Sequence, residues 1–419
     1  MNRIICGDCR EVLKTFPRES IDLVIYSPPY YGLRDYSEKA VTVWGGDPNC
    51  EHEWVDQRVG LVHENRNFLK GTQEEVKASG RGVTWIRKYD SSRAAYCVKC
   101  GAWRGQLGLE PDWRMYIQHL VEINREVKRV LKKTGSLYVV IGDTYAGSHC
   151  GRGDKTLFQN FRRAKVAESM YQKSSPQEKA VGYQPKCLMG IPWRFAFAMI
   201  EDGWILRNAI IWYKPNHMPE SVRDRLTKTY EYIFHFVKSR KYYYNLDMIR
   251  VPHKEGVIRW GGDIMKVPKS HKKSQGLAEA LVLEDRPWRR KRGKNPGDFW
   301  MINTRPFPEA HFAVYPIDIC LRPILSSCPP DGVVLDPACG AGTTLLACEL
   351  INKKMWEAFR LPVNEHAKKV DWRLRWIGIE IVPDYVEIAK KRLKPYICQK
   401  TLIEVVESSK KPDFSKVRA

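Results

Sequence analysis

The sequence predicts an α/β fold in which a mostly parallel sheet is flanked by helices. Short apolar runs rich in β-branched residues alternate with amphipathic stretches in which apolar residues recur every three or four positions. Pro-rich or Gly-rich turns directly follow two of the apolar runs, at residues 27–30 and 336–342. Three long polar stretches interrupt this pattern, and we interpret them as insertions into the α/β core.

The elements follow in chain order from length and periodicity. Six short runs rich in β-branched or aromatic residues are predicted to be strands: residues 21–26, 136–141, 205–212, 230–237, 333–335 and 376–379. The clearest helix covers residues 113–131 and is expected to stop at Gly135. Two further helices are expected over residues 343–352 and 384–393.

The composition excludes some classes of protein and favours one kind of partner. Among 419 residues, 43% are hydrophobic and 28% are charged, which excludes whole-chain disorder. Seventy Lys and Arg against 48 Asp and Glu give a net charge of +22, which favours nucleic acid as a partner over a small neutral substrate. A basic but inert solvated surface is the alternative.

No apolar run is long enough to cross a membrane, and the first residues do not form a signal peptide. We therefore expect a cytoplasmic, nucleoid-associated protein without a membrane partner. The 12 Cys are expected to be free thiols, some of them in a metal site, rather than a disulfide framework.

The strongest chemical signal is the turn Asp336-Pro337-Ala338-Cys339-Gly340-Ala341-Gly342, between a predicted strand and the helix that starts at Thr343. Such a turn lets a ligand approach the backbone closely. A second predicted strand ends in Glu380, and a carboxylate in that position accepts hydrogen bonds from ribose hydroxyls. The alternative is a tight turn and a surface Glu.

The second signal is Ser27-Pro28-Pro29-Tyr30, which directly follows the first long predicted strand. Two consecutive prolines remove two backbone donors, so the segment offers carbonyl oxygens, a hydroxyl and an aromatic face. Taken alone, a Pro-Pro turn after a strand is usually only a loop.

Together the two motifs resemble those of S-adenosylmethionine-dependent DNA amino-methyltransferases, the family that modifies cytosine N4 or adenine N6. Ser27 to Tyr30 looks like the catalytic tetrapeptide, and residues 336–344 look like the methionine-binding loop. Asp8, Glu380 and the segment 311–316 match further motifs, and the order of the motifs is similar to the β group. The resemblance implies a Rossmann-like methyltransferase fold and a restriction-modification role.

The resemblance also assigns residues. It implies that S-adenosylmethionine contacts Asp8, Asp336, Pro337, Cys339, Gly340, Gly342, Thr343 and Glu380. Catalysis falls to Ser27, Pro28, Pro29 and Tyr30, with the Ser27 hydroxyl and the Pro28 carbonyl accepting from the amino group and Tyr30, together with Tyr31, stacking on a flipped base. Ser at the first position favours cytosine N4, and adenine N6 is the alternative. Carbon-5 methylation would instead need a Cys nucleophile, typically in a Pro-Cys dipeptide, and the chain lacks that dipeptide.

A third constellation combines Cys50 and His52 with Cys97 and Cys100. Four such ligands form a closed tetrahedral zinc site, so we expect a structural Zn²⁺ that folds the insertion without touching the chemistry. Unrelated thiols in a loop are the alternative.

The basic segments supply candidate DNA contacts. One cluster interleaves an aromatic with cations, as expected for phosphate contacts and stacking: Arg286, Trp288, Arg289, Arg290, Lys291, Arg292 and Lys294. Lys214 and Arg223 lie in a segment that resembles a family segment near the target base. A merely solvated basic loop is the alternative for the cluster.

These assignments divide the chain. Residues 1–36 and 106–146 form the catalytic half of the core, 188–252 continue it, and 301–407 form the cofactor-binding half. Residues 37–105 carry the zinc site, 147–187 are a basic and polar insertion, 253–300 recognise DNA, and 408–419 are a tail.

The predicted activity is site-specific methylation of double-stranded DNA, with a cognate restriction endonuclease and homodimerisation left open. Two other functions stay open: a catalytically inactive, zinc-bearing nucleic-acid-binding protein, and an RNA amino-methyltransferase.

Overall fold

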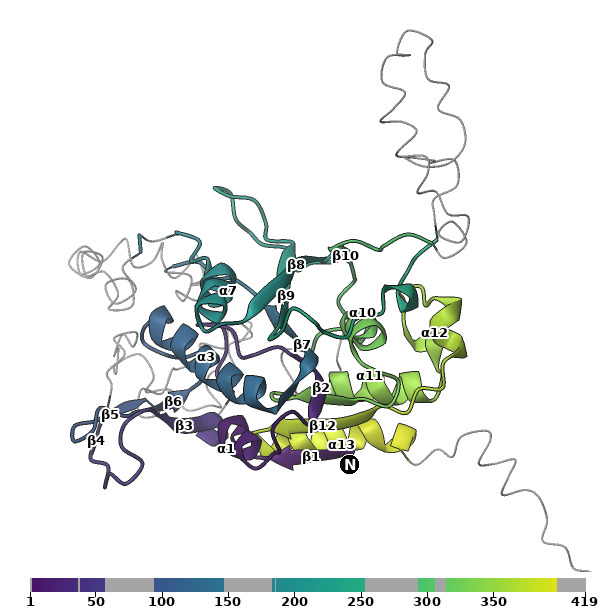
Figure 1. Cartoon of the computed structure of the whole chain (residues 1–419). Helices are drawn as coiled ribbons and strands as arrows, with labels where there is room; N and C mark the ends of the chain where they lie inside the picture. Colours follow the sequence, from purple (N-terminus) through teal and green to yellow (C-terminus); the bar gives the residue numbers. More distant parts are fainter. Residues whose placement is uncertain are drawn as a thin grey trace, which may run out of the picture.

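A computed structural model describes residues 2–36, 38–56, 94–146, 183–184, 186–252, 293–305 and 314–397 of the chain (Figure 1). Its main sheet has eight strands in the order β1-β12-β11-β2-β7-β9-β8-β10. Among the described strands, β9 alone runs antiparallel to its neighbours in this sheet, which confirms the mostly parallel sheet. The strands are β1 (Arg3–Cys6), β2 (Ile21–Tyr26), β7 (Leu131–Ile141), β8 (Ile205–Tyr213), β9 (Tyr230–Val237), β10 (Phe299–Met301), β11 (Val333–Asp336) and β12 (Arg375–Glu380).

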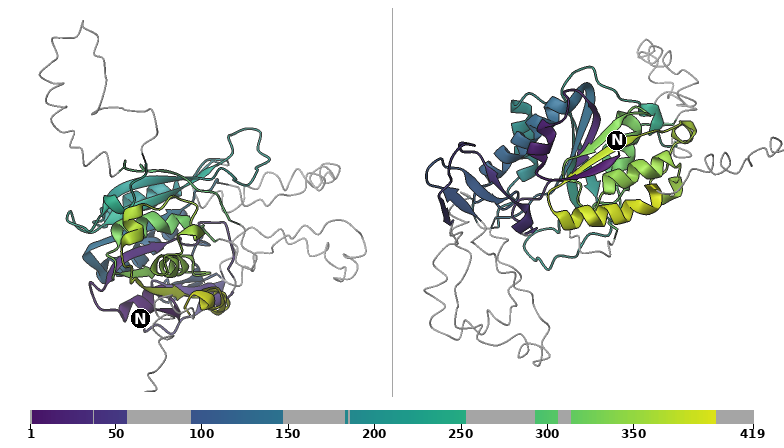
Figure 2. Two further views of the ribbon diagram at one scale, coloured as in Figure 1. Left: turned by 90° about the vertical axis from the view of Figure 1, so that its right-hand side faces the viewer. Right: turned by 90° about the horizontal axis from the view of Figure 1, so that it is seen from below.

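Helices cover both faces of this sheet (Figures 1 and 2). One face packs against α1 (Cys9–Lys14), α3 (Trp113–Val130) and α7 (Ile191–Glu201). The other packs against α10 (Asp318–Ser327), α11 (Thr343–Asn352) and α13 (Pro383–Ile397). Each face has its own apolar core, because the side chains of the central strands alternate between the two faces.

A second, smaller sheet has four antiparallel strands in the order β3-β6-β5-β4. Its strands are β3 (Val41–Trp44), β4 (Trp54–Asp56), β5 (Ala95–Cys97) and β6 (Trp103–Gln106). Trp44 and Trp103 join the core on the α3 face, so this sheet packs directly on the main domain. Short elements complete the fold: η1 (Glu38–Ala40), η3 (Leu246–Met248), η5 (Trp356–Ala358) and α12 (Glu365–Lys369).

The strongest predicted elements agree with the structure. β2, β9 and α11 have the predicted bounds, whereas the predicted end of the long helix is wrong. α3 ends at Val130 and β7 begins at the next residue, because Leu131 takes an extended conformation and pairs with Ile21. The prediction missed the short elements β1, α1, α7, β10, α10 and α12 and the strands of the small sheet.

Several expectations fall on residues outside the described ranges, among them most of the insertions at 147–187 and 253–300 and the tail. Among the described residues, no helix is both long enough and apolar enough to span a bilayer.

Candidate active site

Both predicted motifs line one cavity of about 370 Å³. β2 and β11 are parallel neighbours, so the residues that follow them emerge at the same edge of the sheet. The catalytic loop, residues 27–30, and the turn of the cofactor loop, residues 337–341, therefore line the same cavity. Its volume lies within the range of small-molecule sites.

The catalytic loop is fixed by side chains from other elements. The Tyr116 hydroxyl on α3 donates to the Pro29 carbonyl at 2.8 Å. The Tyr30 hydroxyl donates to Glu231 Oε2 at 2.8 Å, and the Ser27 hydroxyl donates to the Tyr30 oxygen at 3.4 Å. Burial, together with the nearby Glu231 charge, raises the pKa of Tyr30 well above its usual range, so its hydroxyl keeps its proton.

Glu231 is a site residue that the sequence interpretation missed. It lies on β9, lines the cavity and accepts a hydrogen bond from the Lys214 ammonium at its other carboxylate oxygen, Oε1. The Lys214 nitrogen also lies 4.2 Å from the centre of the Trp212 ring. One signal was available in the sequence, since Glu231 is the sole acidic residue in the predicted strand 230–237, whose other residues are apolar or aromatic apart from His235.

The cofactor loop is supported from beneath by Asp336. This side chain is 1% exposed and does not line the cavity. Its Oδ2 accepts from the Thr344 hydroxyl at 2.6 Å and from the Tyr315 hydroxyl at 3.1 Å, and its Oδ1 accepts from the Ala338 amide. Burial raises the pKa of Asp336 to about 7.

Two glycines shape the same loop. Gly340 and Gly342 have φ values of 50° and 73°, a region that favours glycine. A Cβ on Gly342 would also lie 3.1 Å from the Ala389 Cβ on α13. Gly340 lines the cavity, together with Pro337, Cys339 and Thr343, whereas Gly342 packs on α13.

Glu380 ends β12 beside this loop and lines the cavity. Its Oε2 accepts from the Gly340 amide at 2.8 Å, and its Oε1 accepts from the Val382 amide at 2.9 Å. Burial raises the pKa of Glu380. Each carboxylate oxygen has a second lone pair, so Glu380 can accept further hydrogen bonds from a ligand.

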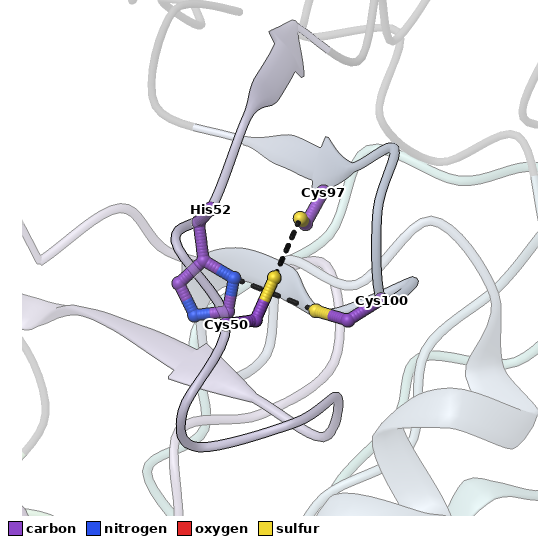
Figure 3. Close-up of side chains that lie close together, drawn as sticks. All are labelled: Cys50, His52, Cys97 and Cys100. Atoms are coloured by element: carbon purple, nitrogen blue, oxygen red, sulfur yellow. Dashed lines mark hydrogen bonds between the residues drawn. The ribbon is translucent and has the colours of Figure 1, made fainter.

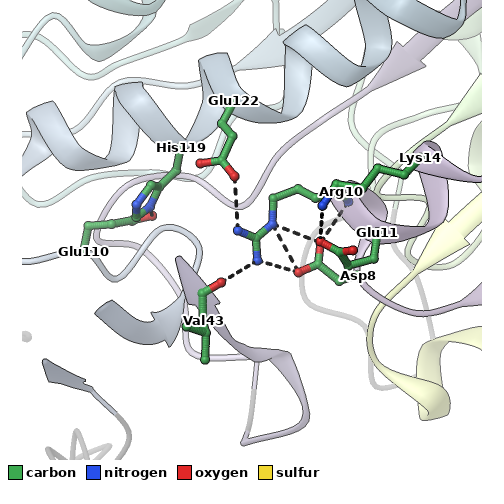
Figure 4. Close-up of polar contacts among 8 residues, drawn as sticks. All are labelled: Asp8, Arg10, Glu11, Lys14, Val43, Glu110, His119 and Glu122. Carbon is green, nitrogen blue, oxygen red and sulfur yellow. Dashed lines mark hydrogen bonds and ion pairs between the residues drawn. The ribbon is translucent and has the colours of Figure 1, made fainter. Parts of the chain in front are cut away.

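Asp8 caps α1 and lines the cavity on the Glu380 side, because β1 pairs with β12 and the Gly7 amide donates to the Glu380 carbonyl at 2.9 Å (Figure 4). Arg10 holds it through an ion pair of 2.6 Å. The same guanidinium donates to the Val43 carbonyl and lies 3.6 Å from the centre of the Trp44 ring on β3. Arg10 therefore joins the cavity to the small sheet.

The small sheet contributes Thr42, Trp44 and Gln106 to the wall of the cavity. Thr42 and Trp44 belong to the insertion predicted at residues 37–105, so this insertion forms part of the cavity wall, whereas the four predicted zinc ligands do not line the cavity. A buried pair also fixes this wall to α3, because His119 Nδ1 lies 2.9 Å from Glu110 Oε1 and the His119 ring stacks on Trp44.

Tyr31 does not fit its predicted role. Its ring is buried in the α3-side core, with its centre 5.5 Å from that of Tyr116, and it does not line the cavity. Tyr30 does line the cavity, although its ring hydroxyl is held by Glu231.

The four predicted metal ligands come together on the small sheet (Figure 3). Their ligand atoms all lie within 4.8 Å of one another. Cys50 Sγ lies 3.9 Å from Cys97 Sγ, and Cys100 Sγ lies 3.4 Å from His52 Nδ1. A tetrahedral zinc ion with bonds of about 2.3 Å to sulfur separates its ligand atoms by about 3.8 Å, so this cluster fits zinc.

The structure places the candidate DNA contacts unevenly. Lys214 lines the cavity, and Arg223 is exposed on the loop between β8 and β9. Lys294 pairs through its backbone with Val251. The rest of the basic cluster, from Arg286 to Arg292, lies outside the described residues.

Comparison with known proteins decides the family. The family model for DNA methylases of the N6/N4 type matches residues 21–391. The chain belongs to this family. It is 31% identical over 391 residues to the type II methyltransferase M.SmaI of Serratia marcescens, covering 93% of this chain and 90% of that protein. It is 29% identical to M.Cfr9I of Citrobacter freundii, covering 93% and 86%.

Solved structures give the same type of neighbour. The PvuII DNA methyltransferase, described as cytosine-N4-specific, matches with a TM-score of 0.47 and 15% identity over 97% of this chain and 91% of that one. The modification methylase TTHA0409 of Thermus thermophilus, solved with S-adenosyl-L-methionine, matches with a TM-score of 0.42 and 19% identity over 96% and 98%.

Family membership confirms the predicted enzyme class, a DNA amino-methyltransferase. Enzymes of this class take their methyl group from S-adenosylmethionine. The predicted fold is likewise confirmed, since the observed sheet with helices on both faces is the methyltransferase arrangement that the resemblance implied.

Proposed function

We propose that the chain methylates cytosine N4 at a specific site in double-stranded DNA, with S-adenosylmethionine as the methyl donor. The observation that carries this proposal is the single cavity that the catalytic loop and the cofactor loop both line. Ser at position 27 supports cytosine; adenine N6 is the second candidate, because the same acceptors serve both amino groups.

The binding roles follow from the lining of the cavity. Glu380 accepts hydrogen bonds from the ribose, and the loop from Pro337 to Ala341 lies against the methionine part. Near Glu380, the apolar side chains of Ile381 and Tyr385 offer a surface for adenine. Asp8, held by Arg10, supplies a further acceptor at this end.

The chemistry depends on a poor nucleophile, because the lone pair of the amino nitrogen is delocalised into the base. When bound, S-adenosylmethionine supplies a methyl group on a positively charged sulfur. The amino nitrogen bonds to the methyl carbon, the carbon–sulfur bond breaks with its electron pair left on sulfur, and the nitrogen releases one proton to solvent water. Ser27 and the Pro28 carbonyl accept hydrogen bonds from the amino group and so localise the lone pair. Tyr30 contacts the base after it has left the duplex.

The direct test is product analysis. DNA free of modification is incubated with the purified chain and S-adenosylmethionine, digested to nucleosides and analysed by mass spectrometry. We expect N4-methylcytosine. N6-methyladenine alone would overturn the choice of base, 5-methylcytosine would overturn the mechanism, and sequencing of the modified DNA would identify the recognition site.

We also propose that Cys50, His52, Cys97 and Cys100 bind one structural Zn²⁺. All four positions of the tetrahedron come from the protein, so no position is open for a reacting water. The ion would fix the small sheet, whose β3 forms part of the cavity wall.

Metal analysis of the purified chain tests this assignment. We expect about one zinc per chain, and we expect Cys97→Ser to lose it together with thermal stability. Cys187→Ser is the control, because Cys187 is an exposed thiol outside the cluster. A zinc-free wild-type chain would contradict the proposal.

M.SmaI and M.Cfr9I are both type II methyltransferases, and the resemblance of this chain to DNA amino-methyltransferases implies a restriction-modification role. We therefore propose a cognate restriction endonuclease as a functional partner. Homodimerisation of the chain stays a prediction.

A further inference from the structure

The Ser27 hydroxyl has to accept a hydrogen bond from the target base, although a serine hydroxyl can equally well donate one. A serine hydroxyl carries one donor hydrogen and two acceptor lone pairs, and it rotates freely about the Cβ–Oγ bond. To localise the lone pair of an amino nitrogen, Ser27 has to accept from the amino group. If its hydrogen pointed toward the base instead, it would repel the amino hydrogens.

A chain of hydrogen bonds leads away from Ser27 and ends at a group that only accepts. Glu231 accepts a hydrogen bond from the Lys214 ammonium at Oε1 and one from the Tyr30 hydroxyl at Oε2. Because a carboxylate has no hydrogen to give, the Tyr30 hydroxyl has to donate toward Glu231. The Tyr30 oxygen is then left as an acceptor for the Ser27 hydroxyl at 3.4 Å.

We propose that Glu231 is a positioning residue that acts through Tyr30 to turn the Ser27 hydrogen away from the target base. With that hydrogen engaged by Tyr30, the lone pairs of Ser27 face the cavity and accept the amino group. This inference rests on the proposed function and names two groups, Glu231 and the Tyr30 hydroxyl, that the methyl-transfer chemistry itself does not require.

Packing around these three side chains fixes the direction in which the hydrogen bonds from Ser27 through Tyr30 to Glu231 run. Gly142 lies against the Tyr30 ring, and a Cβ there would lie 2.7 Å from a ring carbon and 3.5 Å from the Glu231 carboxyl carbon. The side chains of Lys214 and Glu231 are only 19% and 13% exposed, so water competes little for their ion pair. Burial keeps the Tyr30 hydroxyl protonated by raising its pKa.

Two isosteric substitutions in the full-length protein test these hydrogen bonds. Tyr30→Phe removes the acceptor for the Ser27 hydrogen, and Glu231→Gln offers an amide that can donate to Tyr30 and so reverse the order of donors. We expect kcat on DNA to fall about 10-fold in Tyr30→Phe and about 10- to 100-fold in Glu231→Gln. The Kd for S-adenosylmethionine should stay unchanged, because neither side chain belongs to the cofactor loop.

The double variant separates positioning from a general loss of structure. Because Glu231 acts through Tyr30, Tyr30→Phe with Glu231→Gln should lose no more kcat than Glu231→Gln alone. Likewise, Tyr30→Phe added to Ser27→Ala should cost no further kcat. The inference would be overturned if the fold-losses in kcat of the single variants multiplied in both double variants, or if the substitutions changed only KM.

The controls match each substitution. Tyr26→Phe removes a hydroxyl that accepts from Asn124 at the end of β2, before the catalytic loop, and Glu365→Gln breaks an exposed Lys–Glu pair on α12. Both should keep wild-type kcat. If Glu231→Gln does not fold, the Tyr30 and Ser27 pair decides alone. A wild-type chain that methylates no DNA overturns the proposed function itself, whereas an active wild type with unaffected variants overturns only this inference.

Discussion

The catalytic loop and the cofactor loop leave neighbouring strands at the same edge of the sheet, yet they are held in opposite ways. In the catalytic loop, prolines remove backbone donors, and the Tyr116 hydroxyl donates to a carbonyl. In the cofactor loop the carboxylates of Asp336 and Glu380 accept from backbone amides. Side chains therefore support the backbone of the catalytic loop through a donor and the backbone of the cofactor loop through acceptors.

This contrast matches what each loop has to present. A catalytic loop that offers acceptors to an amino group needs its support from donors outside it. A loop that approaches a ligand through its backbone needs buried carboxylates to fix the turn. Because each loop has its own supporting contacts, we expect a substitution in one of them to lower either turnover or cofactor affinity, but not both.

Ser27→Ala tests the catalytic side and should have the largest effect. We expect kcat to fall by one to three orders of magnitude, because the hydrogen bond of Ser27 strengthens mainly in the transition state. Cofactor affinity, measured by calorimetry, should stay nearly intact. Ser20→Ala, before the other end of β2, is the control. An equal loss of cofactor affinity would break the separation between the two loops.

Glu380→Ala tests the cofactor side. It removes the proposed ribose acceptor and leaves the Gly340 and Val382 amides without their partner. We expect the Kd for S-adenosylmethionine to rise about 10- to 100-fold by calorimetry, since two to three hydrogen bonds are lost. Glu387→Ala, an exposed Glu on α13, should bind normally. A wild-type Kd for S-adenosylmethionine in Glu380→Ala would contradict the assignment of Glu380 to the ribose.

Asp336 makes the support of the cofactor loop depend on pH. Its pKa is about 7 in the folded chain and lies near the ordinary value of 3.8 when unfolded. Between these values the folded state binds more protons, so this group's contribution to the free energy of unfolding falls as pH rises from about 4 to about 7. The stabilisation is present at low pH and lost at high pH.

Asp336→Asn should remove this dependence. We expect the wild-type chain to lose about 2–3 kcal/mol of stability from this group between pH 5 and 8, and the variant to lose less. Urea unfolding at the two pH values measures the difference. Asp331→Asn, an exposed Asp that precedes the same strand, is the control. Parallel pH dependence in Asp336→Asn and wild type would contradict the assignment.

The sequence was most informative where a local pattern determined the structure. Strands such as β2 and the helix α11 carry their own periodicity, and both motifs follow strands that pair as neighbours. The joining of the two loops in one cavity could therefore be predicted. The four metal ligands could be paired as well, because Cys-x-His and Cys-x2-Cys spacings are local signals.

Other features depended on contacts between distant segments. Glu231 reaches Tyr30 across 201 positions, and Arg10 reaches the Val43 carbonyl on a separate sheet. Tyr31 shares its residue type with Tyr30, and only the direction of the backbone separates the core ring from the cavity ring. Residue type cannot distinguish such pairs, because tertiary packing decides which way each side chain points.

Arg223→Ala should have the smallest effect and should leave both loops unaffected. Arg223 is exposed on the loop between β8 and β9, which starts beside the cavity residue Lys214. If it contacts one phosphate, its removal should reduce the slope of log affinity for DNA against log salt by about 0.9, while kcat at saturating DNA and cofactor affinity stay unchanged. Arg373→Ala is the control with the same change of charge, because Arg373 pairs with Asp371 and precedes β12, at the sheet edge opposite the cavity. Filter binding or fluorescence anisotropy over a series of salt concentrations measures both slopes. Equal slopes in the two variants would remove Arg223 from the DNA-binding surface, whereas a lower slope only in Arg223→Ala would extend the comparison to a third region that binds DNA without taking part in either loop.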